Sequence, residues 1–488
     1  MVSVLKEAHD RHVQIRALLN LHPNPKADNR EHYKLFNFNL VKRINTELKD
    51  AFAINDFRYL WLNAVHHQKL VLVFNDKGLI AYLGTCDIQY QRLLDRWCEI
   101  TCKYQGTTAI QLYRVFVERW TEHTEVLRKA GKRGELKPIG RPGQPGRADR
   151  YIQQLSRTYG NPERNNPFPI GGGIGRNPPH QPVNYSHRIE FLPNQFVGAK
   201  FFTGEDSEAP PYLEDAKKQD PTYKFAPSGM TGIYFQIKKA IENTEKFIYM
   251  EDQYLVCDEK MGNLEPIVTP LVQKVKESNF KKLIILCTRI DEINRDFQFT
   301  GWEHRRNFIK RLLDAGKEKV VVCQYRSNDD LKSGIKDDFV SPFYVHSKTW
   351  FFDDELLICG SANCNRRGYS HDSELNGTVY DTQKSFVKEL RIRTWKARLN
   401  TEGAKEQKFD LADFLSATKY WESPLSYGLT IETCGQDVDR FKPIKWPDRP
   451  LTKTDIVSGI TGQQGAEWLI NTIRQYGLWH LVVDPDGT

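Results

Sequence analysis

The stretch from Tyr344 to Asn376 constrains the fold more than any other part of the sequence. Two short apolar runs, 349–352 and 356–359, flank the polar residues at 353–355. An apolar run, a polar turn and a second apolar run predict two antiparallel strands joined by a tight turn. The chain therefore reverses direction here, and polar residues before the first strand return close to polar residues after the second.

Four polar side chains flank this predicted hairpin: His346 and Lys348 precede it, and Ser361 and Asn363 follow it. His346 and Lys348 are two residues apart, so on a strand they point to the same face. An ammonium, an amide and a hydroxyl can neutralise or hydrogen-bond phosphoryl oxygens while an imidazole attacks or donates a proton. The four residues therefore predict a site for an anionic phosphoryl group.

A second copy of the pattern lies at Val65 to Asp87. His67 and Lys69 again precede an apolar run, which is followed by a polar turn and by another apolar run that ends at Gly84-Thr85. This copy is three residues longer between its lysine and its glycine, and the extra residues fall in the turn, where insertion costs little. The two copies predict one site built from two parts of the chain.

The pattern H-x-K-x(4)-D-x(6)-G-S-x-N, complete at 346–363 and partial at 67–85, resembles the HKD motifs of the phospholipase D superfamily. The resemblance implies an α/β fold in which two pseudo-symmetric α-β-α sandwich halves share one active site at their interface. It also implies phosphodiester cleavage through a phosphohistidine, without a metal or another cofactor. In that chemistry His67 would attack phosphorus, and His346 would protonate the leaving alcohol and then activate water.

The same resemblance gives further residues a place in the site. Lys69 and Lys348 would be catalytic cations, since they would neutralise the phosphoryl oxygens without a metal. The substrate phosphoryl group would also be bound by Thr85, Ser361 and Asn363.

Two carboxylates would orient catalytic side chains: Asp353 of the complete motif, and Glu374 of the sequence D-S-E that follows it. The first copy departs from the pattern, because Phe74 occupies the position of Asp353. We expect Phe74 to pack in the core. We expect Asp76, in the adjacent turn, to be exposed rather than to replace the missing carboxylate.

At 488 residues, the chain is longer than one hydrophobic core usually supports. The positions of the motifs predict a first half at 1–130 and a second half at 229–400. Residues 131–228 are expected to be a linker or insertion, because their first part is rich in Gly, Pro, Asn and Arg. Residues 401–488 form an extension that we expect to pack on the second half.

The two predicted halves differ in length before their first motifs. Residues 247–254 predict a strand that opens the second half, but the first half has about a dozen residues before its own strand at 12–19. We therefore expect the first half to lack its opening strand, either because the chain is a fragment or because another segment supplies that strand.

Composition narrows the class of protein. No apolar run approaches the ~20 residues of a transmembrane helix, and no Sec signal is visible at the N-terminus. The nine cysteines are odd in number and scattered, so we expect reduced thiols rather than disulfides. Apart from the two motifs, no His, Cys, Asp or Glu cluster has the spacing of metal ligands.

The sequence I-Y-M-E-D-Q-Y at 248–254 resembles a segment of the lipid-cleaving phospholipases D. This resemblance implies hydrolysis of glycerophospholipids to phosphatidic acid at a phospholipid membrane surface, with no nucleic acid partner. The complete motif is most like that of bacterial effectors delivered by type VI secretion. That likeness implies a toxin made in the bacterial cytoplasm, with a secretion apparatus and an immunity protein as partners.

Two alternatives stay open from the sequence. A nuclease of the same superfamily could use the net charge of +8 to bind nucleic acid. A catalytically inactive relative could bind lipid or a protein partner, since Phe74 replaces the motif carboxylate.

Overall fold

The computed structural model describes residues 2–20, 36–48, 51–56, 66–75, 78–87, 97–121, 171–176, 181–182, 231–261, 264–290, 295–326, 343–370, 372–399 and 409–442. Helices and strands are mixed throughout these ranges, which confirms the predicted α/β class. No helix in the described ranges is long and apolar enough to cross a membrane.

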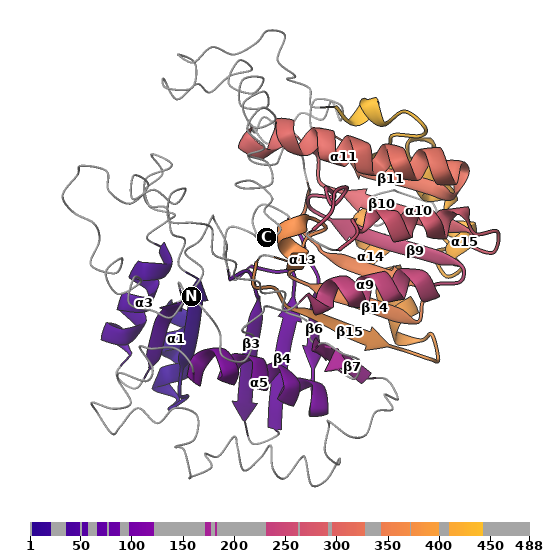
Figure 1. Ribbon diagram of the computed structural model, residues 1–488. Helices are drawn as coiled ribbons and strands as arrows, with labels where there is room; N and C mark the ends of the chain where they lie inside the picture. The colour runs from indigo at the N-terminus through magenta and orange to yellow at the C-terminus, as the bar shows by residue number, and fades with distance from the viewer. Residues whose placement is uncertain are drawn as a thin grey trace, which may run out of the picture.

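A nine-stranded sheet organises the second half (Figure 1). Across the sheet the strands follow the order β16 (Ile431–Thr433), β11 (Val320–Tyr325), β10 (Lys282–Cys287), β9 (Phe247–Asp252), β13 (Thr349–Phe352), β14 (Leu356–Gly360), β15 (Asn376–Tyr380), β7 (Gly171–Arg176) and β8 (Gln181–Pro182). Strands β9, β10 and β11 are parallel, and the remaining pairings are antiparallel. The predicted hairpin is therefore formed by β13 and β14.

Helices cover both faces of this sheet. Ile248 and Met250 of β9 pack with the helices α9 (Gly232–Asn243), α10 (Val268–Lys276) and α11 (Arg295–Gly316), which lie in front of the sheet in Figure 1. Phe247 and Tyr249 point to the opposite face and pack with α14 (Phe386–Leu399), α15 (Phe414–Ala417) and α16 (Lys419–Glu422). Because alternate residues of a strand face opposite sides, a strand covered on both sides must be apolar throughout. The second half is thus a three-layer α-β-α sandwich.

The first half is smaller in the described ranges. Strands β1 (Arg16–Asn20) and β2 (Phe52–Asp56) form a parallel pair, which packs with α1 (Val2–Asp10) and α3 (Phe36–Glu47). A separate antiparallel sheet contains β3 (Leu70–Asn75), β4 (Gly78–Gly84) and β6 (Thr101–Tyr104), and α5 (Gly106–Thr121) packs on it. Half-buried and exposed residues alternate along β3, so one face of this strand is open to solvent.

The described strands of the first half form two separate sheets. In the second half, β9 lies between β10 and β13 and joins the parallel strands to the hairpin. In the first half, the parallel pair and the sheet that carries β3 are separate, and no described strand connects them. Strand β9 of the second half therefore has no counterpart in the described part of the first half.

The linker prediction is wrong at Gly171–Arg176. This segment forms β7, which pairs antiparallel with β15 at the edge of the large sheet. A backbone can pair with an edge strand whatever its side chains, because the unpaired N–H and C=O groups of that edge need partners. At the opposite edge, β16 of the C-terminal extension pairs with β11, so the described part of the extension packs on the second half as expected.

The two halves share one hydrophobic core. Leu83 and Tyr104 of the first half belong to the same buried cluster as Leu357 and Cys359 of β14. The contact is close at Gly377 of β15, where an added Cβ would lie 2.3 Å from the Tyr104 hydroxyl. The sheet of the first half is therefore held against the hairpin that carries the second motif.

Short elements complete the described structure: β5 (Trp97–Cys98), β12 (Tyr344–Val345), α13 (Arg366–Ser370), and the 3-10 turns at Lys317–Lys319, Pro424–Tyr427 and Val438–Phe441. Strands β5 and β12 come from different halves and pair with each other in parallel.

We predict that Arg391→Met will lower the free energy of unfolding by ~3–5 kcal/mol, because it leaves one partner of a buried ion pair unpaired. Arg391 on α14 is fully buried; its Nε and Nη2 donate to the Asp354 carboxylate at 2.6 and 2.9 Å, and its Nη1 donates to the Leu411 carbonyl. Arg393→Met on the same helix is the control, since Arg393 is exposed and should contribute about 0–1 kcal/mol. Denaturant titrations of both variants measure the difference.

Candidate active site

His67 lies where the two halves cross. A β-bridge joins His66 to Ser373, and the His67 backbone N–H donates to the Ser373 carbonyl at 2.9 Å. This backbone contact places the imidazole of His67 beside Glu374, with Nδ1 at 2.9 and 3.1 Å from the two carboxylate oxygens. Glu374 is fully buried, and the His67 side chain is 23% exposed. The buried carboxylate thus contacts the imidazole at Nδ1, while the rest of the ring stays partly exposed to solvent.

His346 repeats this arrangement with the halves exchanged. Strand β12 pairs with β5, and the His346 N–H donates to the Cys98 carbonyl at 3.2 Å. The next residue, Glu99, accepts from His346 Nδ1 at 2.7 Å. Each histidine is therefore oriented through its Nδ1 atom by a glutamate from the opposite half of the chain.

Glu374 was predicted as an orienting residue, whereas Glu99 was not singled out. A signal for it exists, because Glu99 follows Gly84 by 15 residues and Glu374 follows Gly360 by 14. Both glutamates precede a strand that pairs with the second strand of its hairpin. The repeated motif could therefore have been extended to include this glutamate.

Thr85 and Ser361 occupy equivalent places, but their hydroxyls point to the chain rather than to an open site. The Ser361 Oγ accepts from the Leu375 N–H at 2.9 Å and donates to its carbonyl. The Thr85 Oγ1 accepts from the Ile100 N–H at 3.0 Å and donates to the carboxylate of the preceding glutamate. Both hydroxyls are buried, so the structure supports a role in fixing the two glutamate segments instead of the expected contact with substrate.

Asp353 does not orient a catalytic side chain as expected. Its carboxylate accepts hydrogen bonds from the backbone N–H groups of residues 245, 246 and 247, at 2.7 to 3.0 Å. It has a positive φ of 52° in the β13–β14 turn and fixes the start of β9, rather than a catalytic side chain. Phe74, at the equivalent place, is half-buried and packs against the shared core as expected. Asp76 lies outside the described residues.

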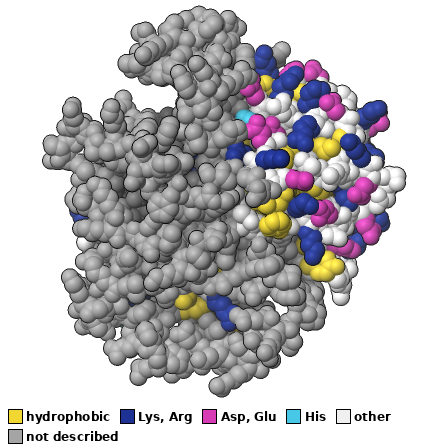
Figure 2. All heavy atoms as spheres, in the orientation of Figure 1, with side chains coloured by type: hydrophobic (Ala, Val, Ile, Leu, Met, Phe, Trp, Pro, Cys, Tyr) yellow, Lys and Arg dark blue, Asp and Glu magenta, His cyan; other side chains and the backbone are white. Residues whose placement is uncertain are grey.

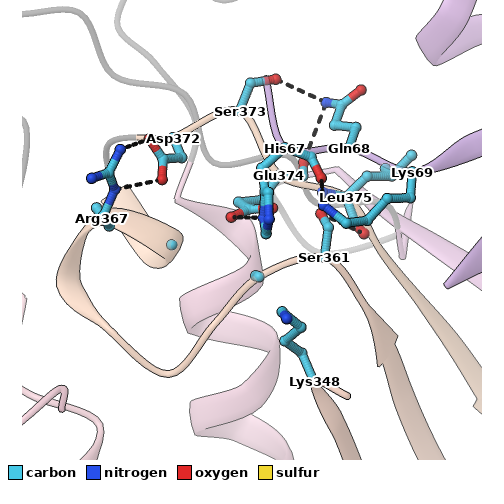
Figure 3. A network of polar contacts seen from close by, with 12 residues as sticks. His67, Gln68, Lys69, Lys348, Ser361, Arg367, Asp372, Ser373, Glu374 and Leu375 are labelled. Atoms are coloured by element: carbon cyan, nitrogen blue, oxygen red, sulfur yellow. Dashed lines mark hydrogen bonds and ion pairs between the residues drawn. The ribbon is translucent and has the colours of Figure 1, made fainter. Parts of the chain in front are cut away.

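Each motif lysine bonds the backbone carbonyl of the histidine two residues before it. Lys69 Nζ donates to the His67 carbonyl at 2.7 Å, and Lys348 Nζ donates to the His346 carbonyl. Their other partners differ: Lys348 donates to the neutral Gln253 Oε1 at 2.9 Å, whereas Lys69 forms an ion pair with Asp87 at 3.2 Å. Figure 3 shows Lys69 on the side of Glu374 and Leu375, and Lys348 below Ser361.

Burial shifts the proton equilibria of two of these groups. It raises the pKa of Glu99 to about 7, although the Lys348 ammonium acts in the opposite direction. It lowers the pKa of Lys348 to about 8, an effect that Glu99 partly offsets and that the Lys69 ammonium increases. Lys69, Lys348 and Glu99, which come from both halves, therefore lie close enough for each charge to affect the others.

Asn363 adds a polar group to this site. The side chain is 5% exposed, and its Oδ1 has no hydrogen-bond partner among the described residues. A buried polar atom without a partner costs about 1–3 kcal/mol, so such atoms are candidates for contact with a ligand. Substrate binding by Asn363 stays a prediction, as does the expected distance of ~5–7 Å between His67 and His346.

A buried polar network fixes the first motif to the parallel strand pair. Asp56, at the end of β2, accepts from His66 Nε2 at 3.1 Å and from Arg119 Nη2 at 3.0 Å. Arg119 also donates to Gln68, whose amide nitrogen donates to the Ser373 hydroxyl and the Glu374 carbonyl. These bonds cross the gap between the two sheets of the first half and set the position of His67.

The described residues contain no group of three or more His, Cys, Asp or Glu side chains placed to hold a metal ion. The site instead gathers two imidazoles, two ammonium groups and two glutamates. This donor set can transfer protons and neutralise an anionic phosphoryl group with its own cations.

We predict that Glu99→Gln will lower the pKa of the His346 imidazole by about one pH unit or more, because it removes the carboxylate that favours the imidazolium. Titration of selectively ¹⁵N-labelled histidine by NMR measures this pKa. Glu422→Gln is the control, since Glu422 pairs with Lys282 at the surface. An unchanged His346 pKa in Glu99→Gln would show that the contact has no electrostatic effect.

Comparison with known proteins finds relatives for part of the chain. Residues 237–393 match the profile of the family described as cardiolipin synthase, PLD-like domain. Phospholipase D A of Dictyostelium discoideum is 28% identical over 195 residues, which cover 33% of this chain and 15% of that protein. A cardiolipin synthase of Staphylococcus aureus is 26% identical over 179 residues, which cover 35% of this chain and 30% of that protein.

The chain therefore matches less than a third of the length of these two relatives. Among solved structures, phosphatidylserine synthase from Haemophilus influenzae Rd KW20 aligns with a TM-score of 0.45 and 11% identity, over 81% of this chain and 76% of that one. The sequence matches show that residues 237–393 are similar to a phospholipase D-like domain.

Proposed function

We propose that this protein is a phosphodiesterase that hydrolyses the head-group bond of glycerophospholipids and releases phosphatidic acid. The observation that carries the proposal is the reciprocal pair of contacts, His67 with Glu374 and His346 with Glu99. Two oriented imidazoles beside two ammonium groups suit a phosphoryl transfer in two steps.

In the first step, Nε2 of His67 attacks phosphorus, and a P–N bond forms as the P–O bond to the head group breaks. Protonated His346 gives its proton to the departing alcohol oxygen, so the alcohol leaves neutral. Lys69 and Lys348 neutralise the charge on the phosphoryl oxygens. Glu374 favours this step because its carboxylate stabilises the positive charge that develops on the attacking imidazole.

In the second step, His346 is neutral and takes a proton from water. The water oxygen attacks phosphorus, the P–N bond breaks, and His67 leaves as a neutral imidazole. Phosphatidic acid is released, and His346 is protonated again. Glu99 supports both steps, since it stabilises the protonated form of His346 without taking part in a bond to substrate.

A lipid substrate is favoured over nucleic acid by two observations. Figure 2 shows Lys and Arg interspersed with Asp and Glu over the visible described surface, without the continuous basic stripe typical of nucleic-acid binding. The relatives named above include a phospholipase D and a cardiolipin synthase. Delivery by a type VI apparatus, with an immunity protein as partner, is a further proposal that rests on the motif resemblance alone.

We predict a bell-shaped dependence of kcat/KM on pH, with its maximum between about 7 and 8. Below about 7 the Glu99 carboxylate gains a proton and no longer stabilises the His346 imidazolium, so activity falls. Above about 8 the Lys348 ammonium loses its proton and its attraction for the phosphoryl group, so activity falls again. Initial rates on phospholipid in Triton X-100 mixed micelles measure the profile, and Glu99→Gln should lose the acidic limb.

We predict different defects for the two histidine variants. His67→Asn should form no covalent adduct, because it lacks the nucleophile. His346→Asn should turn over natural substrate at least about 10²-fold more slowly, yet still form the adduct from a substrate with a good leaving group, which needs no proton. Mass spectrometry of the trapped protein locates the phosphoryl group; an adduct on His346 would reverse the two roles.

We predict that activity survives exhaustive treatment with EDTA, because the ammonium groups of Lys69 and Lys348 neutralise the phosphoryl group in this mechanism. Parallel assays on phosphatidylethanolamine, phosphatidylcholine and plasmid DNA measure the activity before and after treatment. Loss of lipid hydrolysis that added calcium or magnesium restores would contradict the mechanism. Cleavage of DNA without lipid hydrolysis would identify a nuclease, and no activity on any substrate would favour an inactive binding protein.

A further inference from the structure

Strand β9 ends at a buried carboxylate that lies beside the second motif. In the antiparallel pairing of β9 with β13, Glu251 is opposite Thr349. Continued by one residue, this register brings Asp252 opposite Lys348, and residues directly opposite each other in an antiparallel pair project to the same face. Both side chains are buried, with residue exposures of 0% and 1%. The end of β9 therefore places the Asp252 carboxylate close to the Lys348 ammonium.

Asp252 also joins two loops that follow strands of the second half. Its Oδ1 accepts from the N–H groups of Tyr254 and Leu255, both at 2.8 Å, and its Oδ2 accepts from the Cys364 N–H at 2.7 Å. Leu255 has a positive φ of 53°, a conformation that is unfavourable for a residue with a side chain and that the Asp252 contact helps to hold. The contact with Cys364 fixes the residue after Asn363, whose side chain is expected to bind substrate.

The next residue of the chain, Gln253, bonds the Lys348 ammonium directly. Its Oε1 accepts from Lys348 Nζ at 2.9 Å, and its Nε2 donates to the Tyr344 hydroxyl at 2.7 Å. The other acceptor for Lys348 is the His346 carbonyl, so both hydrogen-bond acceptors of this cation are neutral. A buried ammonium with neutral acceptors depends on charges at longer range to keep its proton.

Four charged side chains act on the Lys348 ammonium at that range. The carboxylates of Glu99, Asp252 and Asp87 raise its pKa, and the Lys69 ammonium lowers it, although burial has the largest effect and lowers the pKa to about 8. Burial raises the pKa of Asp252 itself, while its backbone N–H donors and Lys348 favour the charged form. Asp252 is the one of these three carboxylates that lies on the same sheet as Lys348.

We propose that Asp252 is a positioning residue for the reaction, which keeps Lys348 protonated and holds the segment of Asn363 in place without contacting substrate. This inference rests on the proposed phospholipase function and identifies a residue that sets its alkaline limit. Without the carboxylate, Lys348 would release its proton at lower pH, and the phosphoryl oxygens would lose one of their two cations.

The competing explanation is that Asp252 only braces the two loops. In that case Asp252→Asn lowers kcat/KM by the same factor at every pH, and the pKa of Lys348 is unchanged. The proposed charge effect predicts instead that the Lys348 pKa falls, because a carboxylate favours the ammonium form and its removal favours the neutral amine. The alkaline limb of the pH profile then moves to lower pH. The position of this limb, rather than the loss of activity, separates the explanations.

The experiment titrates Lys348 by NMR in protein that carries ¹³C at the lysine Cε, with the resonance assigned by its absence in Lys348→Arg. Asp252→Asn should lower the Lys348 pKa by about half a pH unit or more. On phosphatidylethanolamine in Triton X-100 micelles, the alkaline limb of kcat/KM should move to lower pH by the same amount.

Asp381→Asn is the matched control. Asp381 also accepts from three backbone N–H groups, so its replacement disturbs a loop in the same way. It lies at the turn end of the β13–β14 hairpin, where its N–H donates to the Glu355 carbonyl. Lys348 precedes the other end of that hairpin, so this variant should leave the Lys348 pKa and the alkaline limb unchanged.

A folded Asp252→Asn variant with an unchanged Lys348 pKa would overturn the inference, whatever its activity. The wild type supplies a second test that needs no folded variant: the ¹³Cγ resonance of Asp252 should show an ionised carboxylate at pH 7, and a protonated carboxyl would also overturn the inference. If the wild type hydrolyses no lipid, the proposed function fails, and the two titrations still decide whether Asp252 keeps Lys348 protonated.

Discussion

The structure depends on two contacts in which a glutamate of one half holds the histidine of the other half. A carboxylate buried without a partner is costly, and a histidine without an orienting partner can rotate away from a productive position. The contacts of Glu374 with His67 and of Glu99 with His346 satisfy both requirements at once. Because each contact crosses from one half to the other, each imidazole is oriented by a carboxylate of the opposite half.

Backbone pairing brings each glutamate beside its histidine. Each histidine and each glutamate follows a residue in a short parallel bridge between the halves, His66 with Ser373 and Val345 with Cys98. A parallel bridge advances both chains together, so the next residue on each chain is again beside its partner. The side-chain pairs are thus a consequence of backbone register. The Thr85 and Ser361 hydroxyls add to this, since each bonds the backbone of the residue that follows one glutamate.

The parts of the fold that the sequence predicts well are local. The hairpin of β13 and β14 has the expected bounds within a residue, because its apolar pattern matches a strand period along the chain. The missing opening strand of the first half stays a prediction, which follows from a difference in length before the two motifs.

The parts that were missed depend on contacts between distant segments. Glu99 has no local pattern that distinguishes it from a surface charge, and only its place in the second copy of the motif indicates a function. Asp353 matches the motif, but its oxygens are taken by backbone amides of the adjacent β9 strand. Strand β7 is rich in glycine and typical of a linker by composition, and its pairing is determined by the free edge of β15.

The contacts between the halves also have a consequence during synthesis of the chain. His67 and its orienting carboxylate are separated by 307 residues. At a translation rate of ~5–20 residues per second, about 15 to 60 s pass between the emergence of the two. During that interval the first half has exposed apolar strands and no surface on which to complete its core. The second half can form its three-layer sandwich as it emerges, apart from the edge strands. The sheet of the first half can then pack against the β13–β14 hairpin. The order in which the protein matures is therefore expected to run against the order in which it is made.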